Sequence, residues 1–194
     1  MNDPLQLDDS VAQALRDEQT VTKSGESVSG QIDGVTTFSP VNHVDHRGRV
    51  FEVFAGESDF WVDPVVYCYC FTIRVLQTKG WGLHLEKADR YTLIDGEVLT
   101  MLYDSRLDSP THGMQQKVVL SAQSVRQLRI PAGVWHMNVN LGEREALLIN
   151  HPTKVYVHEH PDRLTLPWNS PVLPVDVAGV FPVQRQFSVD CVCS

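Results

Sequence analysis

The stretch that decides the fold class is YTLIDGEVLTMLY, residues 91–103. Two runs rich in apolar, β-branched and aromatic residues flank the dipeptide Asp95-Gly96, which is typical of a loop or a β-hairpin turn. Each run is too short for an ordinary helix and ends at turn residues. The stretch therefore predicts two β-strands that are separated by a loop or a hairpin turn.

Short runs of the same kind lie on both sides of this stretch. Loop-forming segments such as Asp108-Ser109-Pro110 and Leu141-Gly142 separate them. No helical period of useful length recurs after residue 31, so we predict an all-β domain that closes into a sandwich, a jelly roll or a barrel. The further predicted strands are Val35–Phe38, Arg49–Phe54, Val65–Val75, Lys117–Leu120, Val125–Ile130, Trp135–Asn140, Ala146–Asn150 and Val155–His158.

Length and charge limit the classes of protein that remain. The chain has 194 residues, enough for one domain with a sizeable core. Its 24 acidic residues outnumber the 16 Lys and Arg, and the resulting formal charge of -8 repels phosphate backbones and anionic lipids. Nucleic acids and membranes are therefore not expected partners. Residues 1–31 carry little apolar surface and are predicted to be an N-terminal extension, followed by a single domain over 32–194.

Neither a secretory signal nor a membrane helix is expected. The first residues are acidic, whereas a signal peptide begins with a cationic segment and an apolar run. The most apolar stretch, Pro64 to Ile73, is about half as long as a membrane helix and is followed by Arg74. A cytoplasmic location is the expectation that follows.

The four cysteines form two Cys-x-Cys pairs, Cys68/Cys70 and Cys191/Cys193. Four thiolates are a possible zinc site. However, residues i and i+2 of a strand share one face, and cysteine is a common small buried residue. We therefore interpret Cys68 and Cys70 as packing residues.

Four segments carry a more specific signal than the strand pattern. They are DHRGRVFEVF at 45–54, GLH at 82–84, DSRLDSPTHG at 104–113, and LSA at 120–122 leading to IPAGVWH at 130–136. In this order and at this spacing they resemble the dTDP-sugar isomerase cupins, the family of dTDP-4-dehydrorhamnose 3,5-epimerase. The resemblance extends from about residue 32 to residue 168. It implies a cupin jelly roll (a double-stranded β-helix) and a homodimer with exchanged N-terminal strands. It also implies a nucleoside-diphosphate 4-keto-6-deoxysugar as substrate, with no metal or other cofactor.

Epimerisation next to a ketone has chemical requirements that these residues can be tested against. A base removes a proton beside the carbonyl, a donor stabilises the enolate oxygen, and an acid returns a proton to the other face. His84 matches the position of the base in the family, and an imidazole suits reversible proton transfer near neutral pH. His136 would be a second histidine of the pocket, positioned to polarise the sugar carbonyl.

Further roles follow from the resemblance. A carboxylate usually orients such a base, and Asp190 is our candidate. Arg47 and Glu52 match positions that reach across the dimer to the nucleotide in relatives, and an Arg suits a pyrophosphate because it donates two parallel hydrogen bonds. Asp104 and Arg106 are predicted to form a structural ion pair within the barrel.

Several positions depart from the family pattern. The arginine before the base is replaced by Trp81, and the tyrosine that acts as the acid falls on Asn150, which leaves Tyr156 as the nearby phenol. Arg90 is a candidate substitute for a lysine of the family pocket. We assign both Trp81 and Arg90 to substrate binding.

The polar residues that line the family pocket on the strand before the base correspond to Tyr69, Phe71, Ile73 and Val75. A register slip of one residue would instead present the intervening residues. We assign Tyr69 and Phe71 to substrate binding.

Two alternatives to an epimerase or isomerase remain open at this point. One is a nucleotide-sugar-binding cupin module whose chemistry has been reduced. The other is a metal-dependent cupin, because His84-x-Glu86-x-x-Asp89 and Pro131-x-Gly133-x-x-His136-x-x-x-Asn140 are loosely similar to cupin metal motifs.

Overall fold

The structure is a computed structural model that describes residues 11, 14–24, 28–56 and 58–180. The chain divides into two compact units, residues 1–30 and 31–194. The strands β1 to β12 and both 3-10 turns belong to the second unit. Asp190, Cys191 and Cys193 lie outside the described residues.

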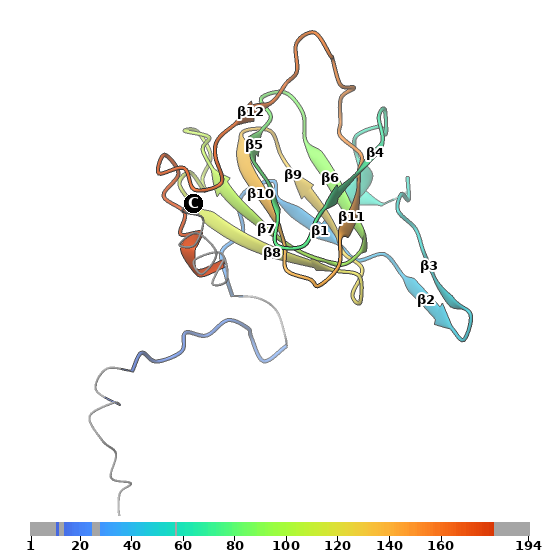
Figure 1. The fold of residues 1–194 in the computed structure, drawn as a ribbon, viewed down its shortest axis with the longest axis horizontal. Helices are drawn as coiled ribbons and strands as arrows, with labels where there is room; N and C mark the ends of the chain where they lie inside the picture. The colour runs from blue at the N-terminus through green and yellow to red at the C-terminus, as the bar shows by residue number, and fades with distance from the viewer. Residues whose placement is uncertain (1–10, 12–13, 25–27, 57, 181–194) are drawn as a thin grey trace, which may run out of the picture. The chain divides into compact units, whose positions relative to one another are not determined.

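The second unit is built from two five-stranded antiparallel sheets and a separate hairpin (Figure 1). The chain crosses from one sheet to the other at nearly every connection, which is the connectivity of a jelly roll. The first sheet has the order β1 (Thr36–Phe38), β9 (Gln127–Ile130), β6 (Asp89–Asp95), β11 (Ala146–Asn150), β4 (Tyr69–Ile73). The second has the order β12 (Leu164–Thr165), β5 (Thr78–Leu83), β10 (Val134–Asn140), β7 (Glu97–Asp104), β8 (Gln115–Ser121). The hairpin pairs β2 (Asn42–Asp45) with β3 (Gly48–Phe51), and short 3-10 turns occur at Asp59–Trp61 and Ala178–Val180.

The period of two along the strands produces two separate apolar layers. Alternate residues of β7, including Val98 and Leu102, point between the sheets and pack with Leu93 and Leu148 of the first sheet. The intervening residues of the second sheet face outward, where segment 166–180 covers them. The members of this outer cluster include Trp81, Leu99, Met101, Met137, Val139 and Leu173.

The predicted ion pair between Asp104 and Arg106 is present, with 2.8 Å between Arg106 Nε and Asp104 Oδ1. The side chain of Asp104 is fully buried and also accepts hydrogen bonds from Ser109 and Thr111. Because every lone pair of this buried carboxylate has a donor nearby, the charge is tolerated inside the barrel.

The all-β prediction is confirmed, with three differences in detail. Val155–His158 is not a strand. Three strands were not predicted: β2, β5 and β12. The packing interpretation of Cys68 and Cys70 is wrong, because both are exposed. Cys70 lies on the edge strand β4 and Cys68 directly precedes it, while Tyr69 and Phe71 line the cavity. Within the described part of the chain, no helix has the length and apolar character needed to cross a membrane.

Candidate active site

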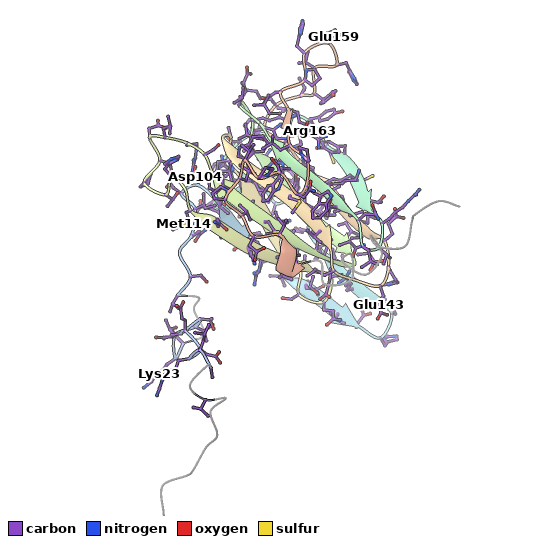
Figure 2. All side chains as sticks on the ribbon, turned by 60° about the vertical axis from the view of Figure 1, so that its left-hand side comes forward. Lys23, Asp104, Met114, Glu143, Glu159 and Arg163 are labelled. Atoms are coloured by element: carbon purple, nitrogen blue, oxygen red, sulfur yellow. The ribbon has the colours of Figure 1, made fainter. Side chains whose placement is uncertain are left out.

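A cavity of about 480 Å³ opens between strands of the two sheets and the loop that precedes β12. Its wall combines aromatic rings with polar and cationic groups, as is usual for small-molecule sites. Figure 2 places Arg163, one of its residues, at the same end of the barrel as Glu159 and away from Glu143. The lining residues are Tyr67, Tyr69, Phe71, Lys79, Gly80, Gly82, His84, Lys87, Asp89, Tyr91, His136, Asn138, Tyr156, His158 and Arg163.

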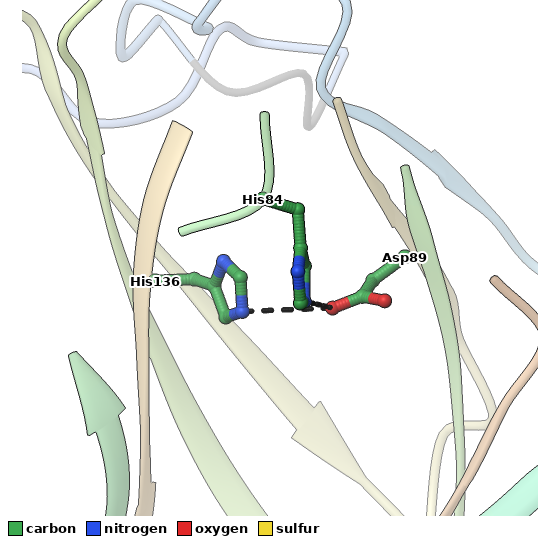
Figure 3. Close-up of side chains that lie close together, drawn as sticks. All are labelled: His84, Asp89 and His136. Atoms are coloured by element: carbon green, nitrogen blue, oxygen red, sulfur yellow. Dashed lines mark ion pairs between the residues drawn. The ribbon is translucent and has the colours of Figure 1, made fainter. Parts of the chain in front are cut away.

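Two histidines and one aspartate meet in the depth of this cavity (Figure 3). His84 directly follows β5, Asp89 begins β6, and His136 lies on β10 opposite Gly82. Asp89 Oδ2 is 3.3 Å from His84 Nε2 and 3.5 Å from His136 Nε2. All three side chains are at least 90% buried, so their mutual interaction is poorly screened by water.

The other ring nitrogen of each histidine faces a backbone carbonyl. His84 Nδ1 contacts the carbonyl oxygen of Asp162, and His136 Nδ1 lies 3.2 Å from that of Val134. A carbonyl oxygen only accepts hydrogen bonds, so both Nδ1 atoms carry the proton. In a neutral imidazole the Nε2 lone pair is then left free, and in both rings it points at Asp89.

The electrostatics of the cluster keep the aspartate charged and favour the neutral form of His136. Burial by itself would raise the pKa of Asp89, but the contact with His84 and the charge of His136 hold it well below its usual range. Burial lowers the pKa of His136 despite the attraction of the Asp89 carboxylate. The outcome is an ionised Asp89 next to a His136 ring whose charged form is disfavoured by burial.

Asn150 and Tyr91 hold Asp89 in place. Asn150 Nδ2 donates to Asp89 Oδ1 over 2.8 Å, and the Tyr91 hydroxyl donates to Oδ2 over 3.0 Å. Asn150 Nδ2 also donates to the hydroxyl of Tyr69 at 2.9 Å, while its oxygen accepts from the backbone N–H of Arg90. Asn150 is thus a fully buried connector between the aspartate and a phenol of the cavity wall.

Cationic groups gather on this wall although the chain as a whole is acidic. Lys79, Lys87 and Arg163 all line the cavity. The Lys87 side chain is buried with its ammonium group 5.5 Å from the centre of the Tyr156 ring, whereas Lys79 and Arg163 are exposed. A Cβ atom added at Gly82 would lie 3.4 Å from His136 Nε2 and 3.6 Å from Arg163 Nε, so a glycine leaves this part of the wall open.

The structure brings some of the predicted residues to the cavity. His84, His136, Tyr69, Phe71 and Tyr156 all line it.

Two others, Trp81 and Arg90, are not at the cavity, which corrects their assignment to substrate binding. Trp81 alternates with Gly80 and Gly82 along β5 and therefore packs in the outer apolar cluster. The Arg90 guanidinium is fully buried on the Trp61 ring and donates to the carbonyls of Asp63, Pro64 and His151.

Arg47 and Glu52 lie outside the cavity of their own chain, on the hairpin segment. Arg47 is exposed at the turn between β2 and β3 and pairs with Asp45 over 2.6 Å. Glu52 follows β3 and is also exposed. The predicted reach of both residues to a partner's nucleotide stays a prediction. Asp190 falls outside the described residues.

Asp89, Lys87 and Arg163 were not predicted as residues of an epimerase site. Asp89 appeared only as part of a loose metal motif, and its place at the start of β6 brings it between the two histidines. Asp162 positions the adjacent loop, because its carboxylate accepts hydrogen bonds from the backbone N–H groups of Leu85 and Glu86. Little in the sequence indicates this role beyond the charged pair Asp162-Arg163, which directly follows Pro161.

The same cluster has the donor set of a metal site. One ligating atom each from His84, Asp89 and His136 lies within 4.8 Å of the others. Two imidazoles and a carboxylate suit divalent transition metals.

Sequence and structure comparisons agree on one family. Residues 29–189 match the family described as dTDP-4-dehydrorhamnose 3,5-epimerase. The chain is 33% identical over 129 residues to the probable low-salt glycan biosynthesis epimerase Agl13 of Haloferax volcanii, covering 66% of this chain and 82% of that protein. It is also 33% identical over 153 residues to the dTDP-4-dehydrorhamnose 3,5-epimerase of Pseudomonas aeruginosa, covering 75% of this chain and 82% of that one.

A solved structure shares the cupin jelly roll. The dTDP-6-deoxy-D-glucose-3,5-epimerase of Legionella pneumophila, in complex with dTDP-4-keto-L-rhamnose, superposes with a TM-score of 0.67 at 25% identity. The superposition covers 77% of this chain and 81% of that chain. The cupin fold predicted from the motifs is therefore confirmed.

Proposed function

Because the chain belongs to the dTDP-4-dehydrorhamnose 3,5-epimerase family and is an epimerase- or isomerase-like enzyme of sugar nucleotides, we propose that it acts on a nucleoside-diphosphate 4-keto-6-deoxysugar. His84 removes the proton beside the ketone. The observation that carries this proposal is the position of His84, which lines the cavity with its Nε2 atom 3.3 Å from the Asp89 carboxylate.

Asp89 stabilises the base once it has taken the proton. The imidazolium that forms carries its new proton on Nε2, the nitrogen that faces Asp89. The developing positive charge then lies beside a buried carboxylate, where the attraction between the two charges is strong. Asp89 thereby takes the role that the sequence assigned to Asp190.

Lys87 is the best donor for the enolate oxygen. We expected His136 to polarise the carbonyl, but its Nδ1 proton is directed at Val134, so neutral His136 offers a lone pair at Nε2 and no N–H. The ammonium group of Lys87 lines the same cavity and is carried by a buried side chain. A cation with little access to water stabilises a developing enolate more strongly than an exposed one.

Tyr69 is the best donor for the returning proton. Its hydroxyl accepts a hydrogen bond from Asn150, so its own proton is available to a substrate. Burial and the nearby Asp89 charge raise the pKa of Tyr69, which keeps the phenol protonated at neutral pH. Tyr91, by contrast, donates its proton to Asp89, and Tyr156 packs against His158 and Lys87.

Lys79 and Arg163 suit the diphosphate of the substrate. Both are exposed cations on the wall of the cavity, and an Arg matches the geometry of phosphate oxygens. Arg163 lies next to Gly82 in space. Gly82 directly follows Trp81, the residue that replaces the arginine of the family. A cation supplied from the loop before β12 would compensate for that loss.

A homodimer is part of the proposal. The β2–β3 hairpin projects from the two main sheets (Figure 1) and exposes the apolar side chains of Val41, Val44 and Val50. Apolar side chains on an isolated two-stranded hairpin are better explained by a partner surface than by solvent. The hairpin also carries Arg47, which would then approach the partner's cavity.

Solvent exchange tests the proposed reaction. The protein is incubated in deuterium oxide with a panel of nucleoside-diphosphate 4-keto-6-deoxysugars, and deuterium next to the carbonyl is followed by mass spectrometry and NMR. Incorporation into at least one member supports the proposal. Tight binding of the sugars without any incorporation would contradict it and would favour the binding module.

A further inference from the structure

We infer that His84, Asp89 and His136 form a binding site for one divalent transition metal ion, such as Zn²⁺, and that the bound ion and the proton taken by His84 exclude each other. The metal site itself is independent of the proposed function. Only the exclusion rests on it, because a histidine whose Nε2 is bound to a metal has no lone pair left for a substrate proton.

The first argument is the direction of the lone pairs. Both Nδ1 atoms face backbone carbonyls, so in the neutral rings both Nε2 atoms are acceptors. They point at the Asp89 carboxylate, which is also an acceptor. Three acceptors that face one another at close range are stable only with a cation between them, either a proton or a metal ion.

The second argument is distance. Asp89 Oδ2 lies 3.3 and 3.5 Å from the two Nε2 atoms, which is longer than the usual hydrogen bond. Ligands at the usual zinc distances of about 2.1 Å lie about 3.4 Å from one another in a tetrahedron. The separation of each nitrogen from the carboxylate oxygen therefore already fits a shared metal ion.

The third argument is the shell around the ligands. Histidine ligands of metals almost always donate their other N–H to a carbonyl or carboxylate, and ligating carboxylates are in turn hydrogen-bonded. Here Asp162 and Val134 supply the carbonyls, while Asn150 and Tyr91 hold Asp89. With three protein ligands facing a cavity, the remaining coordination positions are open to solvent or to an anionic ligand.

Cobalt titration tests the site without any measurement of activity. The full-length protein is stripped with EDTA and titrated with Co²⁺, whose visible absorption reports coordination. One equivalent is expected to bind. His84→Gln, His136→Gln and Asp89→Asn should each weaken binding by more than the roughly 10- to 100-fold that loss of an outer-shell partner costs. Glu86→Gln is the matched control, because Glu86 is an exposed acid of the same loop that pairs with Lys154, and it should bind like the parent.

X-ray absorption of the Zn²⁺-loaded parent keeps the test decisive if a variant fails to fold. Two imidazole ligands and one or more oxygen ligands are expected. Fewer than two imidazoles, or parent-like Co²⁺ binding by the folded His84→Gln and His136→Gln proteins, would overturn the metal site.

Exclusion is tested on the reaction itself. One equivalent of Zn²⁺ should abolish deuterium incorporation, and EDTA should restore it. Metal binding in a protein that shows no exchange in either state would contradict the proposed function and leave the metal site supported. Exchange that increases with bound Zn²⁺ would overturn the exclusion.

Discussion

Asn150 and Tyr69 are direct partners in the pairing of β11 with β4, and Asn150 Nδ2 lies 2.9 Å from the Tyr69 hydroxyl. In the resemblance, the acid tyrosine of the family falls on Asn150. The phenol of this chain is therefore one strand away from the expected position and is held by the residue that replaced it. This arrangement accounts for an acid step without a tyrosine at position 150.

Tyr69→Phe should separate proton removal from inversion. Without the phenol, His84 still exchanges the substrate proton with solvent, but return of a proton to the opposite face should slow by about 10²- to 10⁴-fold. NMR of the sugar product measures deuterium and configuration together. Tyr103→Phe, in the outer apolar cluster, is the control. Loss of inversion in Tyr156→Phe but not in Tyr69→Phe would assign the acid to Tyr156.

Asn150→Tyr should impair the protein rather than restore the family pattern. Asn150 is fully buried and bonded to Arg90, Asp89 and Tyr69, so a larger ring overpacks the site at a cost of about 1–3 kcal/mol. The free energy of unfolding, measured with denaturant, and the rate of deuterium exchange should both decrease. A variant of parental stability with faster inversion would show that the pocket still accepts a phenol from β11.

Arg163→Gln should weaken binding of the nucleotide sugar more than it slows chemistry. The exposed guanidinium is proposed to contact the diphosphate, and a charge-assisted hydrogen bond contributes about 1.5–3 kcal/mol. We expect KM to rise about 10-fold or more with a smaller change in kcat. Arg126→Gln, an exposed arginine outside the cavity wall, is the control. An unchanged KM would remove Arg163 from the binding site.

Asp104 should make the fold sensitive to acid. Burial would raise its pKa, but hydrogen bonds from Arg106, Ser109 and Thr111 hold it well below the usual range. Since the folded-state pKa is lower than the unfolded-state value of about 3.9, the stabilisation is present above that pH and is lost as the pH falls through the folded-state value.

Asp104→Asn should therefore cost about 3 kcal/mol at pH 7, because it leaves the Arg106 charge without its partner. The difference from the parent should shrink as both proteins are acidified below pH of about 4. Urea unfolding of both proteins across this pH range measures the difference in their free energies of unfolding. A constant difference at all pH values would contradict the role of this ion pair.

The hairpin should mediate self-association. Light scattering of the parent at micromolar concentration is expected to give the mass of a dimer. Val44→Asp and Val50→Asp place charges on the exposed hairpin and should produce monomers. Val119→Asp, at a half-exposed valine of β8, should leave the dimer intact. A monomeric parent would remove the hairpin from the proposed interface.

The fold could be predicted where the composition of a segment is typical of a β-strand. Strand β7 is largely apolar, and the turn at Asp95-Gly96 before it was visible in the sequence. That turn connects the two sheets, because β6 belongs to one sheet and β7 to the other. Strand β5, TKGWGL, was missed because it contains two glycines and few β-forming residues. Tertiary packing explains the glycines. A Cβ atom at Gly80 would lie 2.5 Å from the carbonyl oxygen of His136, so β5 needs a glycine there to pair closely with β10. Val155–His158 is the opposite case. Its composition is typical of a strand, but the segment is exposed and pairs with no strand of the described residues.

The site was predictable for residues that lie in motifs and not for those that only the fold brings together. His84 and His136 were found because their flanking residues resemble a family. Trp81 and Arg90 were misassigned because the face of the strand on which each residue lies depends on register. Asp89 was not recognised as the partner of His84, since a carboxylate at the start of an apolar strand gives no sequence signal of the two imidazoles that surround it.

The central claim is that His84 Nε2 takes the substrate proton, and the rate of solvent deuterium incorporation in the folded His84→Gln variant tests it most directly. With a 4-keto sugar that the parent exchanges, the account predicts a loss of about 10²- to 10⁴-fold in the initial rate, with a parental rate for His112→Gln, an exposed histidine outside the cavity. Incorporation by His84→Gln at the parental rate would contradict it.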